Sequence, residues 1–154
     1  MKSKVKKRRL IYFILFNFTT ILIYAFMLKC FYHKINFENI INLDFQYNIV
    51  TLAATIGGFL FTSISILISV IDKSSIKPYW ENHYLDTLNL SAFFGIIMFL
   101  LVIILSVLAI LFNVFREKEI FITIQVFLIL VGFSNFGFSI KELIFVVRTL
   151  KKQS

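Results

Sequence analysis

Four long apolar stretches, each free of Asp, Glu, Lys, Arg and His, dominate the pattern of the chain. They cover residues 10–28, 47–71, 88–114 and 120–140. An α-helix rises about 1.5 Å per residue, so about 20 apolar residues cross a hydrocarbon layer about 30 Å thick. Each stretch has about that length or more. The pattern therefore predicts an all-α fold, a four-span transmembrane helical bundle that forms one membrane domain over residues 1–154.

Small and polar residues within the spans gather on particular helix faces. Lipid gives no hydrophobic reward for helix association, so such residues mark packing faces. A helix with 3.6 residues per turn rotates by about 100° per residue. At this rotation, one face of the second span, about 80° wide, contains Thr51, Ala54, Gly58, Thr62, Ser65 and Ser69. Large residues such as Ile49 and Leu60 occupy the opposite face, and we expect them to contact lipid.

The third and fourth spans carry weaker versions of the same pattern. On the third span the face consists of Ser91, Gly95, Ser106, Ala109 and Asn113. Amides are costly in hydrocarbon unless they are paired or hydrated, so we expect Asn17, Gln125 and Asn135 to point inward. One interpretation of these faces is that they pack the four helices of one chain. The other is that copies assemble and the face of the second span lines a narrow, uncharged pore.

Lys and Arg are unevenly distributed between the tails and the loops. The N-terminal tail, residues 1–9, carries six and the C-terminal tail, residues 141–154, carries four, whereas each loop carries two. The positive-inside bias is counted in Lys and Arg, and it places both termini in the cytoplasm. Lys exceeds Arg by twelve to four, which together with abundant Ile, Asn and Phe is typical of an AT-rich bacterial genome. We expect a multi-pass protein of the bacterial inner (plasma) membrane.

The middle loop has the composition of a short interfacial helix. Ser74 and Ser75 can cap a helix that begins near Pro78. Aromatic rings with a polar atom favour the headgroup region. The predicted interfacial anchors are Tyr79, Trp80 and Tyr84. Anchoring is the expected role of this helix, and a gate or a docking site for a soluble partner is the alternative.

The composition argues against several classes of function. No ionisable residue lies within the spans, whereas proton- or cation-coupled transporters rely on such residues. His33 and His83 are expected on opposite sides of the membrane, and a single cysteine, Cys30, excludes an internal disulfide. No phosphate-binding loop or nucleophile motif is present. We expect no enzyme activity, no metal site and no cofactor.

The basic N-terminal tail is the remaining signal. Its six cations are Lys2, Lys4, Lys6, Lys7, Arg8 and Arg9. Each contributes about 1 kcal/mol of attraction to an anionic leaflet, which makes the tail a topology determinant that binds lipid headgroups. Alternatively, the tails of an oligomer bind a polyanion such as an oligonucleotide, with steep salt dependence. The expected partners are membrane lipid, further copies of the chain, and a cytoplasmic protein or oligonucleotide at this tail.

The basic tail, the four short-looped spans and the lack of transport or catalytic residues resemble small four-helix membrane components of bacterial anti-phage defence systems, such as Kiwa-like and Hailong-like membrane proteins. The resemblance covers the whole chain as architecture. It implies a protein that perturbs or senses the membrane when a cytoplasmic partner signals, often as an oligomeric channel. We therefore expect an oligomeric pore-forming or channel-like effector. The alternatives are a non-conducting membrane adaptor or bacteriocin-immunity protein, and then a holin-like lysis protein.

Overall fold

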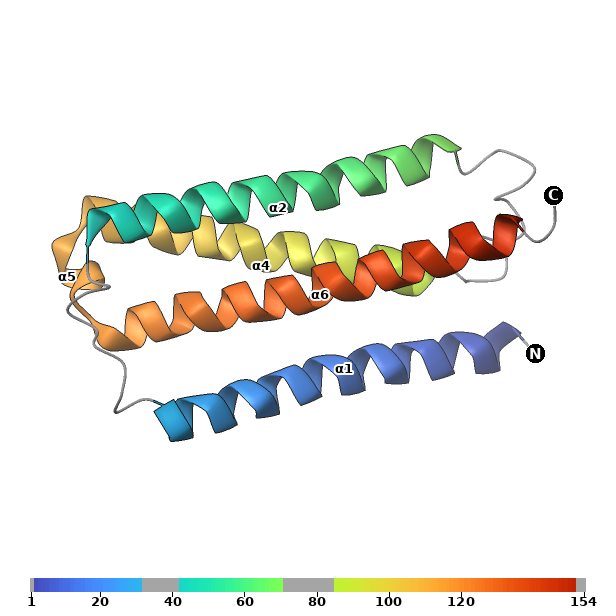
Figure 1. Ribbon diagram of the computed structural model, residues 1–154, viewed down its shortest axis with the longest axis horizontal. Coiled ribbons are helices and arrows are strands. Elements are labelled where there is room, and N and C mark those ends of the chain that lie inside the picture. The colour runs from blue at the N-terminus through green and yellow to red at the C-terminus, as the bar shows by residue number, and fades with distance from the viewer. Residues whose placement is uncertain (1, 32–41, 71–84, 152–154) are drawn as a thin grey trace.

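The computed structural model describes residues 2–31, 42–70 and 85–151, and these residues are helical almost throughout (Figure 1). The helices are α1 (Lys2–Phe31), α2 (Leu43–Val70), α4 (Asp86–Leu111), the one-turn α5 (Asn113–Arg116) and α6 (Glu119–Lys151). The four long helices each contain an apolar segment long enough to cross a membrane. The predicted all-helical, four-span architecture is confirmed at this level.

The second and third spans begin and end differently from the charge-free stretches. The second span was predicted from residue 47, but α2 begins at Leu43 because the side-chain oxygen of Asn42 accepts a hydrogen bond from the backbone N–H of Phe45, at 2.6 Å. This is an N-cap interaction, which fixes a helix start. The third span was predicted to end at residue 114, but α4 ends at Leu111 because Phe112 is extended, with φ −127° and ψ 108°. The chain then turns back through α5.

The tails differ from the predicted division of the chain. The basic residues 2–9 belong to α1, so they continue the helix of the first span. α6 continues past residue 140, where the fourth charge-free stretch ends, to Lys151, so most of the predicted C-terminal tail belongs to this helix. The start of α1 and the end of α6 lie at the same end of the bundle (Figure 1). The predicted interfacial helix, with Tyr79, Trp80 and Tyr84, lies outside the described residues.

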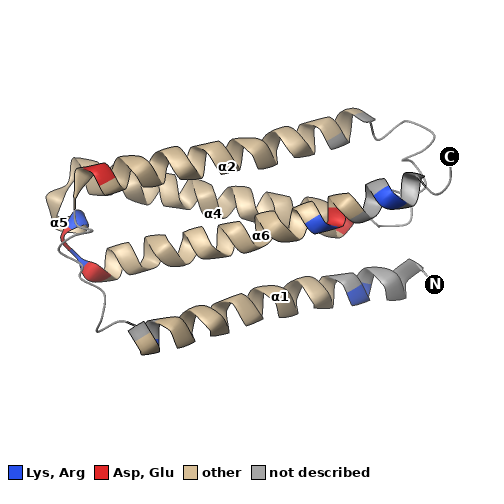
Figure 2. Ribbon diagram, viewed as in Figure 1, with Lys and Arg blue, Asp and Glu red and all other residues tan. Residues whose placement is uncertain are grey.

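Charge is confined to the two ends of the bundle. Among the described residues, most charged positions lie near the helix termini, and the middle of every long helix is uncharged (Figure 2). Lys141 and Glu142 of α6 lie further in, ten and nine residues before the end of that helix. The start of α1, with Lys7 and Arg8, and the last third of α6, with Lys141 and Arg148, lie towards one end of the bundle, whereas α5, with Arg116, lies at the other. This separation leaves an uncharged central band, as a membrane-spanning bundle requires.

α4 lies at the centre of the bundle and packs against both α2 and α6, whereas α1 lies beside α6 (Figure 1). The core between α2, α4 and α6 contains Leu60, Phe99 and Val102, each at most 2% exposed. Ile49, at 5% exposed, also faces this core. The expectation that the large residues of the second span contact lipid is therefore wrong for Ile49 and Leu60.

Two glycines allow this close packing. A Cβ at Gly95 on α4 would lie 2.9 Å from Cδ1 of Leu60, so Leu60 of α2 occupies the space that a side chain would need. A Cβ at Gly132 on α6 would lie 2.9 Å from Cζ of Phe99. Each contact places a large side chain on one helix against a small residue on its neighbour, which is how tightly packed interiors avoid voids.

Candidate functional site

The small and hydroxyl-bearing face of α2 points away from the rest of the chain. We call this face the α2 stripe, and it consists of Thr51, Ala54, Gly58, Thr62, Ser65 and Ser69. All six residues are exposed, and a Cβ at Gly58 would meet no atom of the structure within 4 Å. The interpretation that this stripe packs the helices of a single chain therefore fails. The large residues opposite it pack inward because α4 presents small residues such as Gly95 and Ala92 to them.

The hydroxyl groups of the α2 stripe bond to their own helix. Thr51 donates to the carbonyl of Tyr47 at 2.9 Å, and Thr62 donates to the carbonyl of Gly58 at 2.9 Å. Ser65 and Ser69 make the same kind of bond, at 3.0 and 2.7 Å. A hydroxyl satisfied in this way can face an apolar neighbour at little cost, and its oxygen still accepts a further bond. The stripe is therefore compatible with both a close helix contact and a water-lined surface.

Amide side chains, by contrast, are buried between the helices. Gln125 of α6 and Gln46 of α2 are both 0% exposed. Their side chains form two amide hydrogen bonds, at 2.8 and 3.2 Å, and Gln125 also donates to the Ser106 hydroxyl of α4 at 3.0 Å. This cluster joins α2, α4 and α6 at one level.

Gln46 was not singled out from the sequence because it precedes the second charge-free stretch by one residue. Its spacing carried a signal, since it lies three, seven and fourteen residues before Ile49, Ala53 and Leu60. These residues share one helix face, and all of them are buried.

The remaining intramembrane polar contacts join α6 to α1 and α4. Asn135 is 0% exposed and donates to the side-chain oxygen of Asn17 at 2.9 Å. The Tyr24 hydroxyl donates to the carbonyl of Thr123 at 2.7 Å. Ser91 and Ser139 share a hydrogen bond of 2.8 Å between α4 and α6. Asn17, Gln125 and Asn135 thus point inward as expected.

Of the third-span face, the structure buries Ser91, Gly95, Ser106 and Ala109 but leaves Asn113 exposed. Asn113 begins α5 and lies beyond the end of the third span, so it does not take part in helix packing there.

The basic residues of the N-terminal tail all lie on α1, at the end of the bundle that also holds the end of α6. Lys7 and Arg8 are exposed, whereas the side chains of Lys2, Lys4, Lys6 and Arg9 lie outside the described ones. His33 and His83 are also outside the described residues, and within the described ranges no group of three His, Cys, Asp or Glu side chains is placed to hold a metal ion. Comparisons with protein-family models, with curated proteins and with solved structures find no match to this chain.

Proposed function

We propose that this chain is an inner-membrane protein of bacteria whose copies associate through the α2 stripe and together enclose a narrow, uncharged pore. The observation that carries the proposal is the exposure of the whole stripe along α2. From Thr51 to Ser69 it covers 19 residues, a rise of about 27 Å along the helix, against a hydrocarbon thickness of about 30 Å. A surface that is small and polar over that depth is unusual for a face that contacts only lipid tails.

The interior of the single bundle supports a pathway between copies over one within a chain. The described helices fill the space between them with side chains such as Leu60, Phe99 and Ile122, each at most 2% exposed. A conduit lined by the α2 stripe would need several copies arranged around a common axis. Its hydroxyl oxygens can accept hydrogen bonds from water. Because rings of charged side chains usually select ions by sign, this lining would discriminate weakly between cations and anions.

We place both tails in the cytoplasm. Because α1 lies on the side of the bundle opposite α2, its basic start would lie at the outer rim of the cytoplasmic face of the assembly. Lys7 and Arg8 are exposed there, in reach of an anionic leaflet, a partner protein or an oligonucleotide. Control by such a partner is what the resemblance to anti-phage defence membrane components implies. This cytoplasmic control is part of the proposal.

One observation favours a second candidate function. Every hydroxyl of the α2 stripe bonds to a carbonyl of its own helix, so the stripe can also form a dry interface with a different membrane protein. That arrangement is a non-conducting adaptor or immunity protein. It predicts a stable complex with another membrane protein and no conductance.

Replacing two adjacent residues of α2 tests the proposal. Thr62→Leu alters the α2 stripe, whereas Ser63→Leu makes nearly the same change on an exposed neighbour about 100° around the helix. Both wild-type hydroxyls bond to their own helix, at 2.9 and 2.8 Å, so the two variants are matched. We expect Thr62→Leu to abolish conductance in planar bilayers and to shift native mass spectra towards the single chain, and Ser63→Leu to do neither.

Three results would contradict the pore. Wild-type protein that conducts nothing, with or without cytoplasmic extract, and that copurifies with one membrane protein would identify an adaptor. Equal conductance of wild type and the Thr62→Leu variant would remove the stripe from the pathway. Killing of the host by overexpression alone, with no partner required, would identify a holin-like lysis protein.

A further inference from the structure

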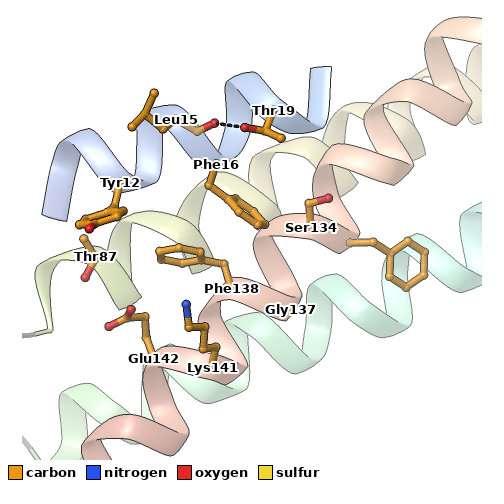
Figure 3. Close-up of a pocket in the computed structure, with 11 residues that line it drawn as sticks. Tyr12, Leu15, Phe16, Thr19, Thr87, Ser134, Gly137, Phe138, Lys141 and Glu142 are labelled. Atoms are coloured by element: carbon orange, nitrogen blue, oxygen red, sulfur yellow. Dashed lines mark hydrogen bonds between the residues drawn. The ribbon is translucent and has the colours of Figure 1, made fainter. Parts of the chain in front are cut away.

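A groove of about 900 Å³ lies between α1 and α6 at the end of the bundle that holds the start of α1 (Figure 3). Its volume falls within the range of about 300–1,000 Å³ that is common for ligand cavities. The groove opens sideways, towards the surroundings of the bundle, because Tyr12 and Leu15 on its α1 side are 66% and 54% exposed. In a membrane this opening faces lipid.

The walls of the groove change in polarity along its length. The charged lining residues, Lys141 and Glu142, lie near the bundle end together with Tyr12 and Thr87. Towards the bundle centre the lining is mainly apolar, with Leu15, Phe16, Phe133 and Phe138, and its polar groups are the hydroxyls of Ser134 and Thr19, of which the second bonds to its own helix. The α6 wall runs from Phe133 to Glu142, which is about 14 Å of helix. That length is close to half of a hydrocarbon core about 30 Å thick. The groove thus has the dimensions and the polarity gradient of one leaflet.

The charges that line the polar end are one cation and one anion. Lys141 and Glu142 are adjacent on α6 and both line the groove. The Lys141 ammonium lies 5.9 Å from the centre of the Phe138 ring, and Glu142 also has an interaction within the chain. Beyond the lining, α1 contributes the exposed Lys7 and Arg8 and α4 contributes Asp86. Two carboxylate oxygens accept several bonds, so Glu142 can receive another donor.

We propose that this groove binds one phospholipid with a primary ammonium headgroup, a phosphatidylethanolamine, from the leaflet that faces the helix ends. Lys141 and the Tyr12 hydroxyl hold the phosphate, and the Glu142 carboxylate holds the ammonium. One acyl chain lies along Leu15 and Phe16 towards the bilayer centre. The lipid fills the space between α1 and α6 and so joins α1 to the rest of the bundle.

The presence of one cation and one anion at the polar end distinguishes this headgroup from the other common ones. A choline headgroup carries the same charge but has no N–H to donate to Glu142. A glycerol headgroup leaves the lipid with a net negative charge and offers no cation to Glu142. We therefore expect phosphatidylethanolamine to bind more tightly than phosphatidylcholine or phosphatidylglycerol.

Photocrosslinking of the full-length protein in vesicles tests the proposal. The probes are phosphatidylethanolamine, phosphatidylcholine and phosphatidylglycerol, each with a photoactivatable acyl chain, and labelled peptides are mapped by mass spectrometry. Wild type should be labelled on α1 and α6 around Leu15 and Phe133, most strongly by phosphatidylethanolamine. Lys141→Gln should reduce this labelling about fivefold, the effect of one cation near a phosphate. Glu142→Gln should abolish the preference for phosphatidylethanolamine over phosphatidylglycerol.

Filling the groove provides the steric test. A Cβ at Gly137 meets no atom of the structure within 4 Å, so Gly137→Leu fits the fold and occupies space in the groove. The Gly137→Leu variant should lose most of the labelling. Ala25→Leu, at an exposed position of α1 outside the groove, should keep it. Ser134→Leu provides a second filling variant. Helix content and gel-filtration profile check that each variant is folded.

Several outcomes overturn the proposal. They are equal labelling by the three lipids, labelling that the folded Gly137→Leu and Ser134→Leu variants retain, and labelling that is unchanged by Lys141→Gln. The groove lies away from the α2 stripe, so Thr62→Leu should leave lipid labelling intact. Failure of the lipid site is therefore distinguishable from failure of the proposed pore.

Discussion

The polar face of α2 and those of α4 and α6 are built from similar residues but have opposite positions in the bundle. Ser91, Ser106 and Ser139 are at most 5% exposed and bond to side chains of neighbouring helices. The hydroxyls of the α2 stripe are exposed and bond only to their own helix among the contacts described. Small and hydroxyl-bearing residues at helical spacing therefore mark a face suited to close contact. They do not reveal whether that contact lies within the chain or outside it.

The amides behave differently because they cannot be satisfied by their own helix alone. An amide side chain has two donors and one acceptor oxygen, whereas a hydroxyl donates once and can bond to the carbonyl one turn earlier. Asn135 donates to the Val131 carbonyl of its own helix at 2.8 Å and still needs Asn17 of α1 for its other bonds. Buried amides thus identify contacts within the chain more specifically than serines do.

The largest expected difference between the two kinds of face is steric, and it can be tested at two glycines, Gly132 on a buried face and Gly58 on the α2 stripe. Gly132→Leu should destabilise the bundle by about 3 kcal/mol because its side chain would overlap the buried Phe99 ring, which a Cβ alone would already approach to 2.9 Å. Gly58→Leu should change the free energy of unfolding by less than about 0.5 kcal/mol. The unfolding free energies of both variants can be measured by titrating the protein in mild, dilute detergent with sodium dodecyl sulphate and monitoring helix content by circular dichroism. Equal destabilisation by the two variants would contradict the assignment of inner and outer faces.

The next largest effect concerns the Gln46–Gln125 pair. Gln125→Leu should cost about 2 kcal/mol, because it leaves the buried Gln46 amide without its partner. Replacing both residues by Leu should recover most of that loss, whereas Gln46→Leu alone should resemble Gln125→Leu. The three unfolding free energies form a double-mutant cycle. Additive costs would show that the two amides do not depend on each other.

The sequence predicted the four spans, the uncharged membrane band and the inward amides, because these follow from local hydropathy and from the cost of an unpaired amide. It predicted the wrong side of α2 as the lipid-facing one, since Ile49 and Leu60 are buried. Gln46 and Asn48 lie on different sides of that helix, and the structure buries the first and exposes the second. What decides between them is the surface offered by Ser106 and Gln125, which are distant in sequence. The helix break at Phe112 was likewise not predicted, because no proline or glycine, the usual sequence signals of a helix end, lies near it.

A smaller effect is expected where α1 meets α6. Asn17→Leu should lower the unfolding free energy by about 1 kcal/mol, the scale of an interhelical hydrogen bond in a membrane, because it removes the partner of Asn135. It should also raise the reactivity of a cysteine placed at Phe138, whose ring lies 5.0 Å from that of Phe16. Thr19→Val provides the control, since the Thr19 hydroxyl bonds to its own helix at Leu15. Unchanged labelling by a thiol reagent would show that the amide pair does not hold α1 in place.

The smallest effect is expected for Tyr24→Phe, and it separates hydrogen bonding from packing at the same junction. The substitution removes the hydroxyl that donates to the Thr123 carbonyl at 2.7 Å but keeps the ring that lies 5.0 Å from Phe127. The loss should be about 0.6 kcal/mol, because the Thr123 carbonyl already belongs to a helix and loses only an additional donor. Tyr24→Ala removes the ring as well and should cost several times more. If Tyr24→Phe and Tyr24→Ala were equally destabilising, the hydroxyl would account for the whole contact. The contacts of α1 would then depend on hydrogen bonds in the way that the α4–α6 contact does at Ser91 and Ser139.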